Sequence, residues 1–217
     1  MSQLEEIQEK NPFSTIRQFA RKSPPPAVEH CNLCGEAIGP RHRHLLDLST
    51  RNLLCACRAC SILFHQPAAG AKARKLIPDR YLHLCGFQIT NGQWDSLRIP
   101  VGMAFFFRNS VTDSPTAMYP GPMGPTESLL TLDAWEDIEE LNPILRTLEP
   151  DVEALMVNRV KEARDYFLVP IDESYRLVGL IRLNWKGLSG GREVWQELDQ
   201  FFAGLKERSR PVGGANA

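Results

Sequence analysis

The sequence predicts an α+β protein in which a small four-cysteine metal module precedes a larger mixed domain. Five of the six cysteines fall between positions 31 and 60, in the pattern C-x-x-C-G followed by C-A-C-x-x-C. Beyond position 76, short runs with strand composition alternate with amphipathic helical stretches. A chain of 217 residues that is 43% hydrophobic has room for such a module beside one ordinary domain.

Two thiolate pairs of this spacing can enclose a tetrahedral ion from two sides, with Zn–S bonds of about 2.3 Å. Gly35 follows the first pair and suits the left-handed turn of a zinc knuckle. Cys55 shares a strand face with Cys57 and is an alternative to it, or a neighbour of the bound ion. The four predicted ligands are Cys31, Cys34, Cys57 and Cys60.

The order of elements in the module indicates a treble clef rather than a plain zinc ribbon. Residues 42–48 and 52–55 have strand composition around a short turn, and the apolar run after Cys60 begins a helix. Zinc is the expected ion. Iron in a rubredoxin-like site is the alternative, because C-x-x-C-G also occurs there, although the second pair lacks the following glycine. Two disulfides are disfavoured because nothing in the sequence indicates secretion.

Composition divides the chain into four predicted segments. Residues 1–27 hold a short helix and a proline-rich linker, 28–75 the zinc-binding module, 76–209 the α+β domain, and 210–217 a disordered tail. In the larger domain we expect strands over 81–90, 99–107, 152–160, 167–171 and 176–183, and helical segments over 134–141, 143–148 and 194–208. Asn91-Gly92 indicates a hairpin turn. Three prolines within 119–125 predict a rigid loop.

The charge pattern excludes few functions. A net charge of −1 and a pI of about 6.5 give no overall case for nucleic-acid binding. Positive charge gathers between residues 10 and 80 and negative charge between 127 and 162, which indicates two solvated faces or a basic module that docks on an acidic partner. The first ten residues lack a signal-peptide core, and the longest apolar stretch is too short to cross a bilayer. We therefore expect a cytoplasmic protein without membrane insertion.

Catalytic motifs are missing from the sequence. It contains no phosphate loop, dinucleotide fingerprint, nucleophile elbow or HExxH, so we expect a non-enzymatic protein. His42 and His44 share one face of a predicted strand and are either metal-site residues or, more commonly, exposed histidines.

The role of a second polar group stays open. Asp151, Glu153 and Arg159 surround one predicted strand, where a carboxylate pair could perform acid–base chemistry, although Asp151 also fits a simple turn. His83 is read as an ordinary residue, and Cys85, in a strand pattern, as a small core residue.

Most of the chain, from about 13 to 208, resembles an uncharacterised family encoded beside uptake [NiFe]-hydrogenase genes, largely in actinobacterial-type clusters. The resemblance implies work on or near hydrogenase, and it carries over no catalytic residue. The segments that carry it are the C-x-x-C-G motif and residues 42–47, 55–64, 99–106, 119–127, 151–159, 169–172, 175–182 and 185–191.

The first functional hypothesis is a zinc-binding accessory protein, a type of chaperone, that assists maturation or assembly of a hydrogenase subunit through contacts with that subunit or with another maturation protein. A rubredoxin-like iron redox protein linked to hydrogenase is the second hypothesis, and a nucleic-acid-binding regulator is the third. The third is disfavoured because no aromatic residues interleave with the basic ones. The residues expected to contact a partner are Arg41, Arg43, Arg51, Tyr119 and Met123.

Overall fold

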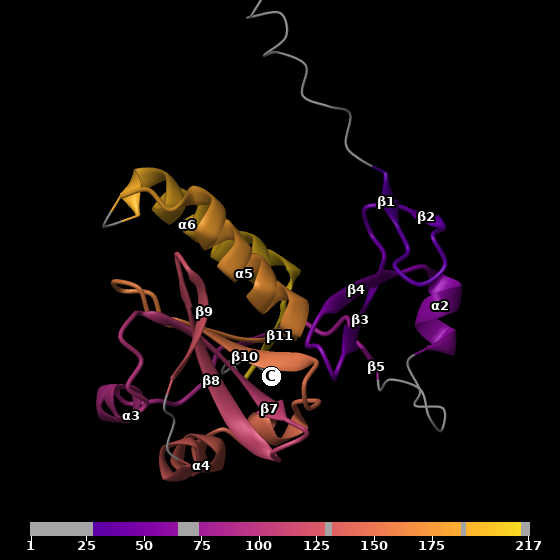
Figure 1. Cartoon of the computed structure of the whole chain (residues 1–217). Helices are drawn as coiled ribbons and strands as arrows, with labels where there is room; N and C mark the ends of the chain where they lie inside the picture. Colours follow the sequence, from indigo (N-terminus) through magenta and orange to yellow (C-terminus); the bar gives the residue numbers. More distant parts are fainter. Residues whose placement is uncertain (1–27, 65–73, 129–131, 188–189, 214–217) are drawn as a thin grey trace, which may run out of the picture.

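A seven-stranded sheet is the largest element of the computed structural model, which describes residues 28–64, 74–128, 132–187 and 190–213 (Figure 1). Its strands lie in the order β12-β6-β11-β10-β7-β8-β9. Neighbouring strands are antiparallel except β6 and β12, which are parallel. The bounds are β6 Leu82–Leu84, β7 Met103–Asn109, β8 Ser114–Gly121, β9 Gly124–Ser128, β10 Glu153–Asn158, β11 Asp165–Pro170 and β12 Arg210–Val212.

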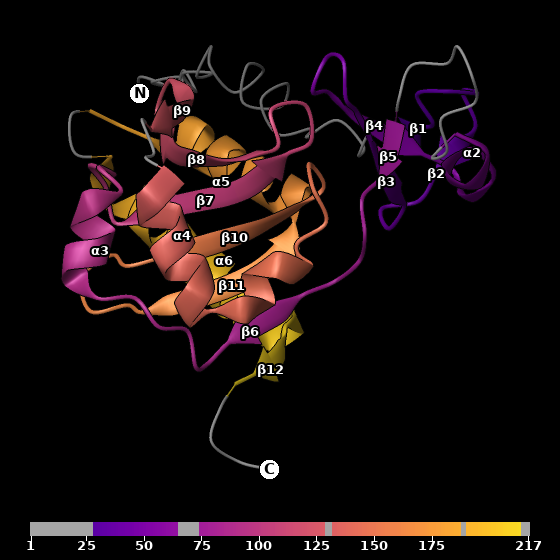
Figure 2. The ribbon, with the colours of Figure 1, turned by 90° about the horizontal axis from the view of Figure 1, so that it is seen from below.

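Helices cover both faces of this sheet, as Figures 1 and 2 show. One face carries α5 (Ile171–Asn184) and α6 (Gly191–Arg208), and the other carries α3 (Asn91–Ser96), α4 (Leu132–Leu141) and the 3-10 helix η1 (Pro143–Thr147). Successive side chains of β7 point to opposite faces of the sheet. Phe106 therefore packs on the α3 and α4 side, while Phe105 packs on the α5 side. Among the described residues, no helix is both long and apolar enough to span a bilayer.

The four-cysteine module lies to one side of the large sheet (Figure 1). It contains a two-stranded sheet, β1 (Glu29–His30) with β2 (Ala37–Ile38), and a three-stranded sheet in the order β4-β3-β5. The latter comprises β3 (Arg43–Asp47), β4 (Leu53–Ala56) and β5 (Arg74–Leu76), and helix α2 (Arg58–Leu63) follows β4. The predicted order of knuckle, hairpin and helix is therefore present. The helix and linker predicted within residues 1–27 lie outside the described residues.

The small sheet has two apolar faces, which attach the cysteine site to the larger domain. Leu45 packs with the cysteines on one face. Leu46, on the other face, packs with Phe105 and Ile171 of the larger domain, where Ile77 joins the same cluster. Both leucines are fully buried. The module is thus packed against the large sheet and α5. The predicted domain boundary at 75/76 stays a prediction.

Two turn predictions in the larger domain were wrong. Asn91-Gly92 is not a hairpin turn, because it lies in the first turn of α3. Thr90 Oγ1 accepts the Gln93 amide hydrogen (3.1 Å) and Gln93 Oε1 accepts the Thr90 amide hydrogen (2.9 Å), which makes a capping box. The capping box starts a helix where the dipeptide alone favours a turn, and the strand expected over 81–90 shortens to β6.

Residues 119–125 form the β8–β9 hairpin rather than a loop. Pro120 lies opposite Pro125, so the two residues that lack an amide hydrogen face each other and no other residue loses its hydrogen-bond donor at that pair. β9 is an edge strand, where prolines are tolerated. Gly124, at a φ of 127°, completes the tight turn.

Residues 176–183 were predicted as a strand and belong to helix α5. The buried positions 171, 174, 177, 178 and 181 follow a helical period, which a run rich in leucine and isoleucine obscures. The prediction of a disordered tail over 210–217 was also wrong in part, because residues 210–212 form β12. There Arg210 N–H donates to Tyr81 O (3.0 Å) and Cys85 N–H donates to Val212 O (2.8 Å).

Candidate metal centre

The first cysteine pair lies on the knuckle between β1 and β2. Cys31 N–H donates to Glu36 O (2.8 Å) and Gly35 N–H donates to Cys31 O (2.9 Å), which closes the turn. Gly35 has a φ of +78°, the left-handed conformation that its lack of a side chain permits. The knuckle therefore presents Cys31 and Cys34 on a rigid turn.

The second pair lies where β4 gives way to α2. Cys57 is the N-cap of α2, and its Sγ accepts the amide hydrogen of Cys60 (3.5 Å). The knuckle is attached to β4 by two hydrogen bonds, from Asn32 N–H to Cys55 O (2.8 Å) and from Cys55 N–H to Asn32 Oδ1 (2.6 Å). These bonds hold the two pairs face to face.

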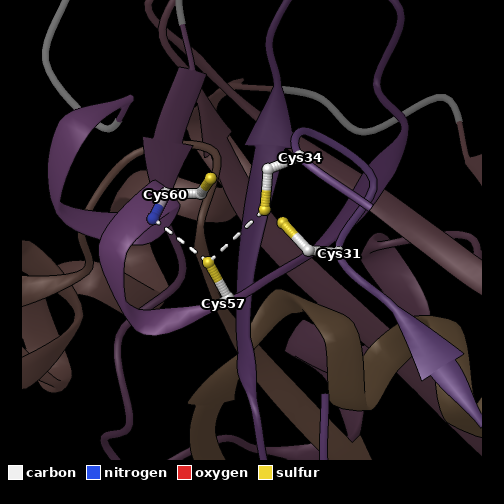
Figure 3. Close-up of side chains that lie close together, drawn as sticks. All are labelled: Cys31, Cys34, Cys57 and Cys60. Atoms are coloured by element: carbon white, nitrogen blue, oxygen red, sulfur yellow. Dashed lines mark hydrogen bonds between the residues drawn. The ribbon is translucent and has the colours of Figure 1, made fainter. Parts of the chain in front are cut away.

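All four sulfur atoms converge on one point, as Figure 3 shows. They lie within 4.8 Å of one another, and Cys34 Sγ is 3.8 Å from Cys57 Sγ. A tetrahedron with Zn–S bonds of about 2.3 Å has edges of about 3.8 Å, so the observed separation fits four ligands of one ion. All four cysteines are free thiols, and Cys31, Cys57 and Cys60 are buried while Cys34 is exposed.

The surroundings of the sulfurs favour a bound cation. Burial acts to raise the pKa of Cys31, but hydrogen bonds from the backbone of Cys57, Leu33 and Cys34 outweigh it and lower this pKa to about 6. At Cys60 burial dominates and raises the pKa well above its usual value. Four ionised sulfurs in so small a volume would repel one another, so the cluster is suited to hold a metal ion, which favours the thiolate form of its ligands.

Cys55 does not lie with the four predicted ligands. It was predicted to share a face with Cys57, but β4 ends at Ala56 and the chain turns into α2. Its sulfur lies within 4.8 Å of ligand atoms of His42 and His44, because His44 and Cys55 are cross-strand partners. Burial, with the charges of Glu29 and Cys31, raises the pKa of Cys55.

Comparison with known protein families shows to which family the chain belongs. The model of a family of unknown function, DUF5947, matches residues 30–209, which include the four cysteines, all the helices named above and every strand of the large sheet except β12. The chain belongs to the DUF5947 family. No curated protein and no solved structure matches it. The DUF5947 description names no activity and no partner.

The predicted contact residues of the DUF5947 chain differ in how available they are. Arg41 and Arg43 are exposed, and Met123, at the tip of the β8–β9 hairpin, is 93% exposed. Tyr119 is half-buried against the core under α3 and α4. Arg51 is half-buried, with its guanidinium paired to the Asp151 carboxylate at 2.8 Å and placed 5.1 Å above the Phe107 ring. Its charge is used inside the chain, which argues against a contact role.

The three charged residues around β10 do not form one site. Asp151 is fully buried and pairs with Arg51. Glu153 accepts from Arg80 Nε (2.6 Å) and from the Glu149 amide (2.8 Å). Arg159 donates to Tyr166 Oη (2.9 Å) and lies over the Trp94 ring. The acid–base interpretation has no support from this geometry.

Two residues that the sequence did not single out lie at a cavity of about 460 Å³. The Cys85 thiol, which is exposed, is 3.5 Å from His83 Nδ1. Spacing alone gave no signal, because the wall is assembled from segments far apart in the sequence: β6, the start of α3, β11 with the loop before it, and α6. The cavity is also lined by cationic side chains and one acid, namely Arg159, Arg164, Lys206 and Asp165.

Proposed function

We propose that this DUF5947 protein holds one zinc ion at Cys31, Cys34, Cys57 and Cys60 and acts as a non-enzymatic accessory protein. The observation that carries the metal assignment is the convergence of four free sulfurs at spacings that suit a tetrahedral ion. Zinc is preferred to iron because the two pairs differ. One pair lies on a glycine knuckle and the other at a helix N-terminus, so a second C-x-x-C-G turn is not formed.

A four-sulfur site has no open coordination position, so its role is structural. The cysteines pack with Leu45 and Ala56, which form the small core of the module. On the other face of the same sheet, Leu46 reaches the larger domain. Metal binding therefore supports both the module and its packing on the large sheet, because binding free energy is also folding free energy in small metal modules.

The accessory role is the part of the proposal that rests on the resemblance to proteins encoded beside uptake [NiFe]-hydrogenase genes. The partner is a hydrogenase subunit or another maturation protein. Arg41 and Arg43 offer exposed positive charge on the module, and Met123 offers an exposed apolar tip on a two-residue turn. Charge of this kind steers association with an acidic partner, while an exposed thioether adds apolar contact area.

Metal content tests the first half of this proposal. The purified full chain should be free of the red colour of a ferric four-sulfur site, and Cys57→Ser should remove one zinc equivalent relative to the wild type, as measured by inductively coupled plasma mass spectrometry. Cys85→Ser is the matched control, because Cys85 lies outside the four-cysteine site. A red protein with iron in place of zinc would favour the redox hypothesis.

A deletion strain tests the second half. Loss of the protein should lower active hydrogenase without changing the transcripts of the structural genes. Arg43→Glu and Met123→Asp should weaken capture of the hydrogenase subunit by the tagged protein, and capture by the wild type should weaken as salt rises. Arg192→Glu, an exposed change at the start of α6, is the charge control. Normal hydrogenase maturation in the deletion strain would refute the accessory role.

A further inference from the structure

His42 and His44 present the same ring nitrogen to each other. His44 Nε2 lies 3.0 Å from His42 Nε2, and the two rings are nearly perpendicular, at 84° with centroids 4.7 Å apart. Neither side chain is the exposed strand histidine that their sequence pattern favours, because the exposed fractions are 9% for His42 and 30% for His44.

Hydrogen-bond partners fix where the ring protons are. His42 Nδ1 faces the Gly39 carbonyl oxygen at 2.9 Å, with the Glu29 carboxylate at 3.4 Å. His44 Nδ1 faces Asp172 Oδ2 at 2.7 Å. All these groups only accept hydrogen bonds, so both Nδ1 atoms carry hydrogen. In the neutral rings both Nε2 atoms then carry lone pairs, and the two atoms are 3.0 Å apart.

Lone pairs on two nitrogen atoms this close repel each other unless a cation, either a proton or a metal ion, lies between or beside the two atoms. Metal ions bind imidazole nitrogens at about 2.0–2.1 Å, and two such bonds at a tetrahedral angle place the nitrogens about 3.3 Å apart. The separation of 3.0 Å is close to that value. The two Nε2 atoms therefore already have about the spacing of two ligands of one ion.

Cys55 supplies a third donor. Its sulfur and the two histidine ligand atoms lie within 4.8 Å of one another. His44 and Cys55 are cross-strand partners on β3 and β4, so the pairing register itself brings imidazole and thiol to one face of the small sheet. This cluster is separate from the four-cysteine set, with which it shares no residue.

Asp172 completes the arrangement from the larger domain. It lies in the first turn of α5, and its second oxygen, Oδ1, is buried without a hydrogen-bond partner among the described residues. Metal-bound histidines usually donate their other ring N–H to a carboxylate, which orients the ring and raises its basicity. A cation held by His44 would also balance the charge of this carboxylate.

We propose that His42, His44 and Cys55 bind a second transition-metal ion, of the zinc class, with Asp172 and the Gly39 carbonyl orienting the two imidazoles. Two imidazoles and one thiolate suit borderline ions such as Zn²⁺ and Co²⁺. Three protein ligands leave the fourth position to water or an outside ligand, unlike the closed four-cysteine site. All three ligands belong to the module, and the hydrogen bond from His44 to Asp172 of α5 places the site where the module meets the larger domain.

Cobalt titration of the full-length protein loaded with one zinc per chain, which fills the four-cysteine site, tests the second site. One Co²⁺ per chain should bind, giving visible d–d bands and a sulfur-to-cobalt charge-transfer band. His44→Asn should abolish this binding, Cys55→Ser should remove the charge-transfer band, and Asp172→Asn should weaken affinity about 10- to 100-fold. His30→Asn, an exposed histidine on β1, is the control and should bind normally.

The competing explanation is a proton shared between the two Nε2 atoms. It predicts that the wild type takes up no Co²⁺ and that the imidazole ¹⁵N resonances stay unchanged when Zn²⁺ is added, and either result overturns the proposal. This spectrum is recorded on the wild type, so it decides the matter even if a variant misfolds. Cys57→Ser should lose zinc from the other site, which separates a failure here from a failure of the four-cysteine assignment.

Discussion

Arg51 Nη1 lies 2.8 Å from Asp151 Oδ1, and this ion pair ties the β3–β4 hairpin of the module to the turn before β10. Asp151 is fully buried and has a φ of 70°, a left-handed conformation that Asp and Asn tolerate better than most residues. Lys75 Nζ lies 3.3 Å from the other carboxylate oxygen, and the Ser110 amide donates to Oδ1 (3.1 Å). Two cations of the module therefore meet one buried anion of the larger domain.

We predict that Asp151→Asn destabilises the protein by about 3 kcal/mol at pH 7. This is the low end for breaking a buried ion pair, since both cations keep some contact with water. Asparagine preserves the left-handed backbone, so the change reports on charge. Urea unfolding measures it. Asp113→Asn, which breaks the exposed pair with Arg108, should change the stability by less than about 1 kcal/mol. Equal losses of stability in the two variants would show that the buried Asp151 pair stabilises the fold no more than an exposed pair does.

The same pair predicts sensitivity to acid. Burial raises the pKa of Asp151, but hydrogen bonds from Ser110 and Arg51 and the charge of Lys75 outweigh it and hold this pKa below its usual value. A carboxyl group of this kind stabilises the fold above its unfolded pKa of about 3.9, and the stabilisation is lost as pH falls through the folded value. The wild type should therefore lose more stability below about pH 4 than Asp151→Asn. Parallel pH profiles in urea unfolding would contradict this.

Metal removal should separate the module from the large sheet. All four tryptophans lie at positions 94, 135, 185 and 195, outside the module, so their fluorescence follows the larger domain. In Cys57→Ser we expect protease cleavage within the module, while the fluorescence transition persists at lower urea because the contacts of Leu46 and Arg51 are lost. Loss of the cooperative fluorescence transition would show instead that the module is integral to one folding unit.

The last helix gives a direct test of core packing. Leu198 in α6 is 3% exposed and packs with the core under α5, so Leu198→Ala should cost about 2–5 kcal/mol. Trp195 in the same helix is only half-buried, so Trp195→Ala should cost less. Leu183→Ala, at a side chain that is 86% exposed, should change stability by less than about 0.5 kcal/mol. A Leu198 effect as small as that of Leu183 would place α6 outside the core.

The sequence predicted the parts of this fold that depend on strong local signals. The thiol pairs, the glycine of the knuckle and the hairpin between them gave the treble clef, because metal geometry restricts the spacing of its ligands. Helix α5 was missed because its apolar run satisfies both strand composition and a helical period. β12 was missed because it has only three residues, one of them Pro211, and so has little strand signal in its sequence. It is a strand because it pairs with β6.

The candidate sites show the same division. Cysteine spacing was enough to propose the four ligands, but nothing in the sequence places Asp172 beside His44, 128 positions away. The salt bridge of Arg51 was equally hidden, since its partner lies 100 positions further on. Such contacts depend on how the module packs on the large sheet, which local patterns do not encode.

Cys85 should be the thiol that alkylating reagents modify first in the metal-loaded protein. Its sulfur is exposed at the cavity, 3.5 Å from His83 Nδ1, whereas each of the other cysteines belongs to one of the two metal clusters. Burial, aided by the charge of Lys206, lowers the pKa of His83 and so favours its neutral ring, whose Nδ1 can accept a hydrogen bond from the Cys85 thiol. His83→Asn should therefore slow modification, as followed by mass spectrometry of peptides.

The cavity wall also predicts which reagent reacts faster. The cavity wall carries three cations, Arg159, Arg164 and Lys206, and one acid, Asp165. The rate at which anionic iodoacetate alkylates Cys85, divided by the rate for neutral iodoacetamide, should therefore be about tenfold higher at low salt than for a free thiol. Lys206→Met should reduce this preference, and added salt should abolish it because exposed charges are screened. Cys85→Ser is the control and should remove the fast-reacting thiol. Faster labelling at Cys34 than at Cys85 would show that the four-cysteine site is not holding a metal, and equal rates for the two reagents would show that the cavity does not concentrate anions.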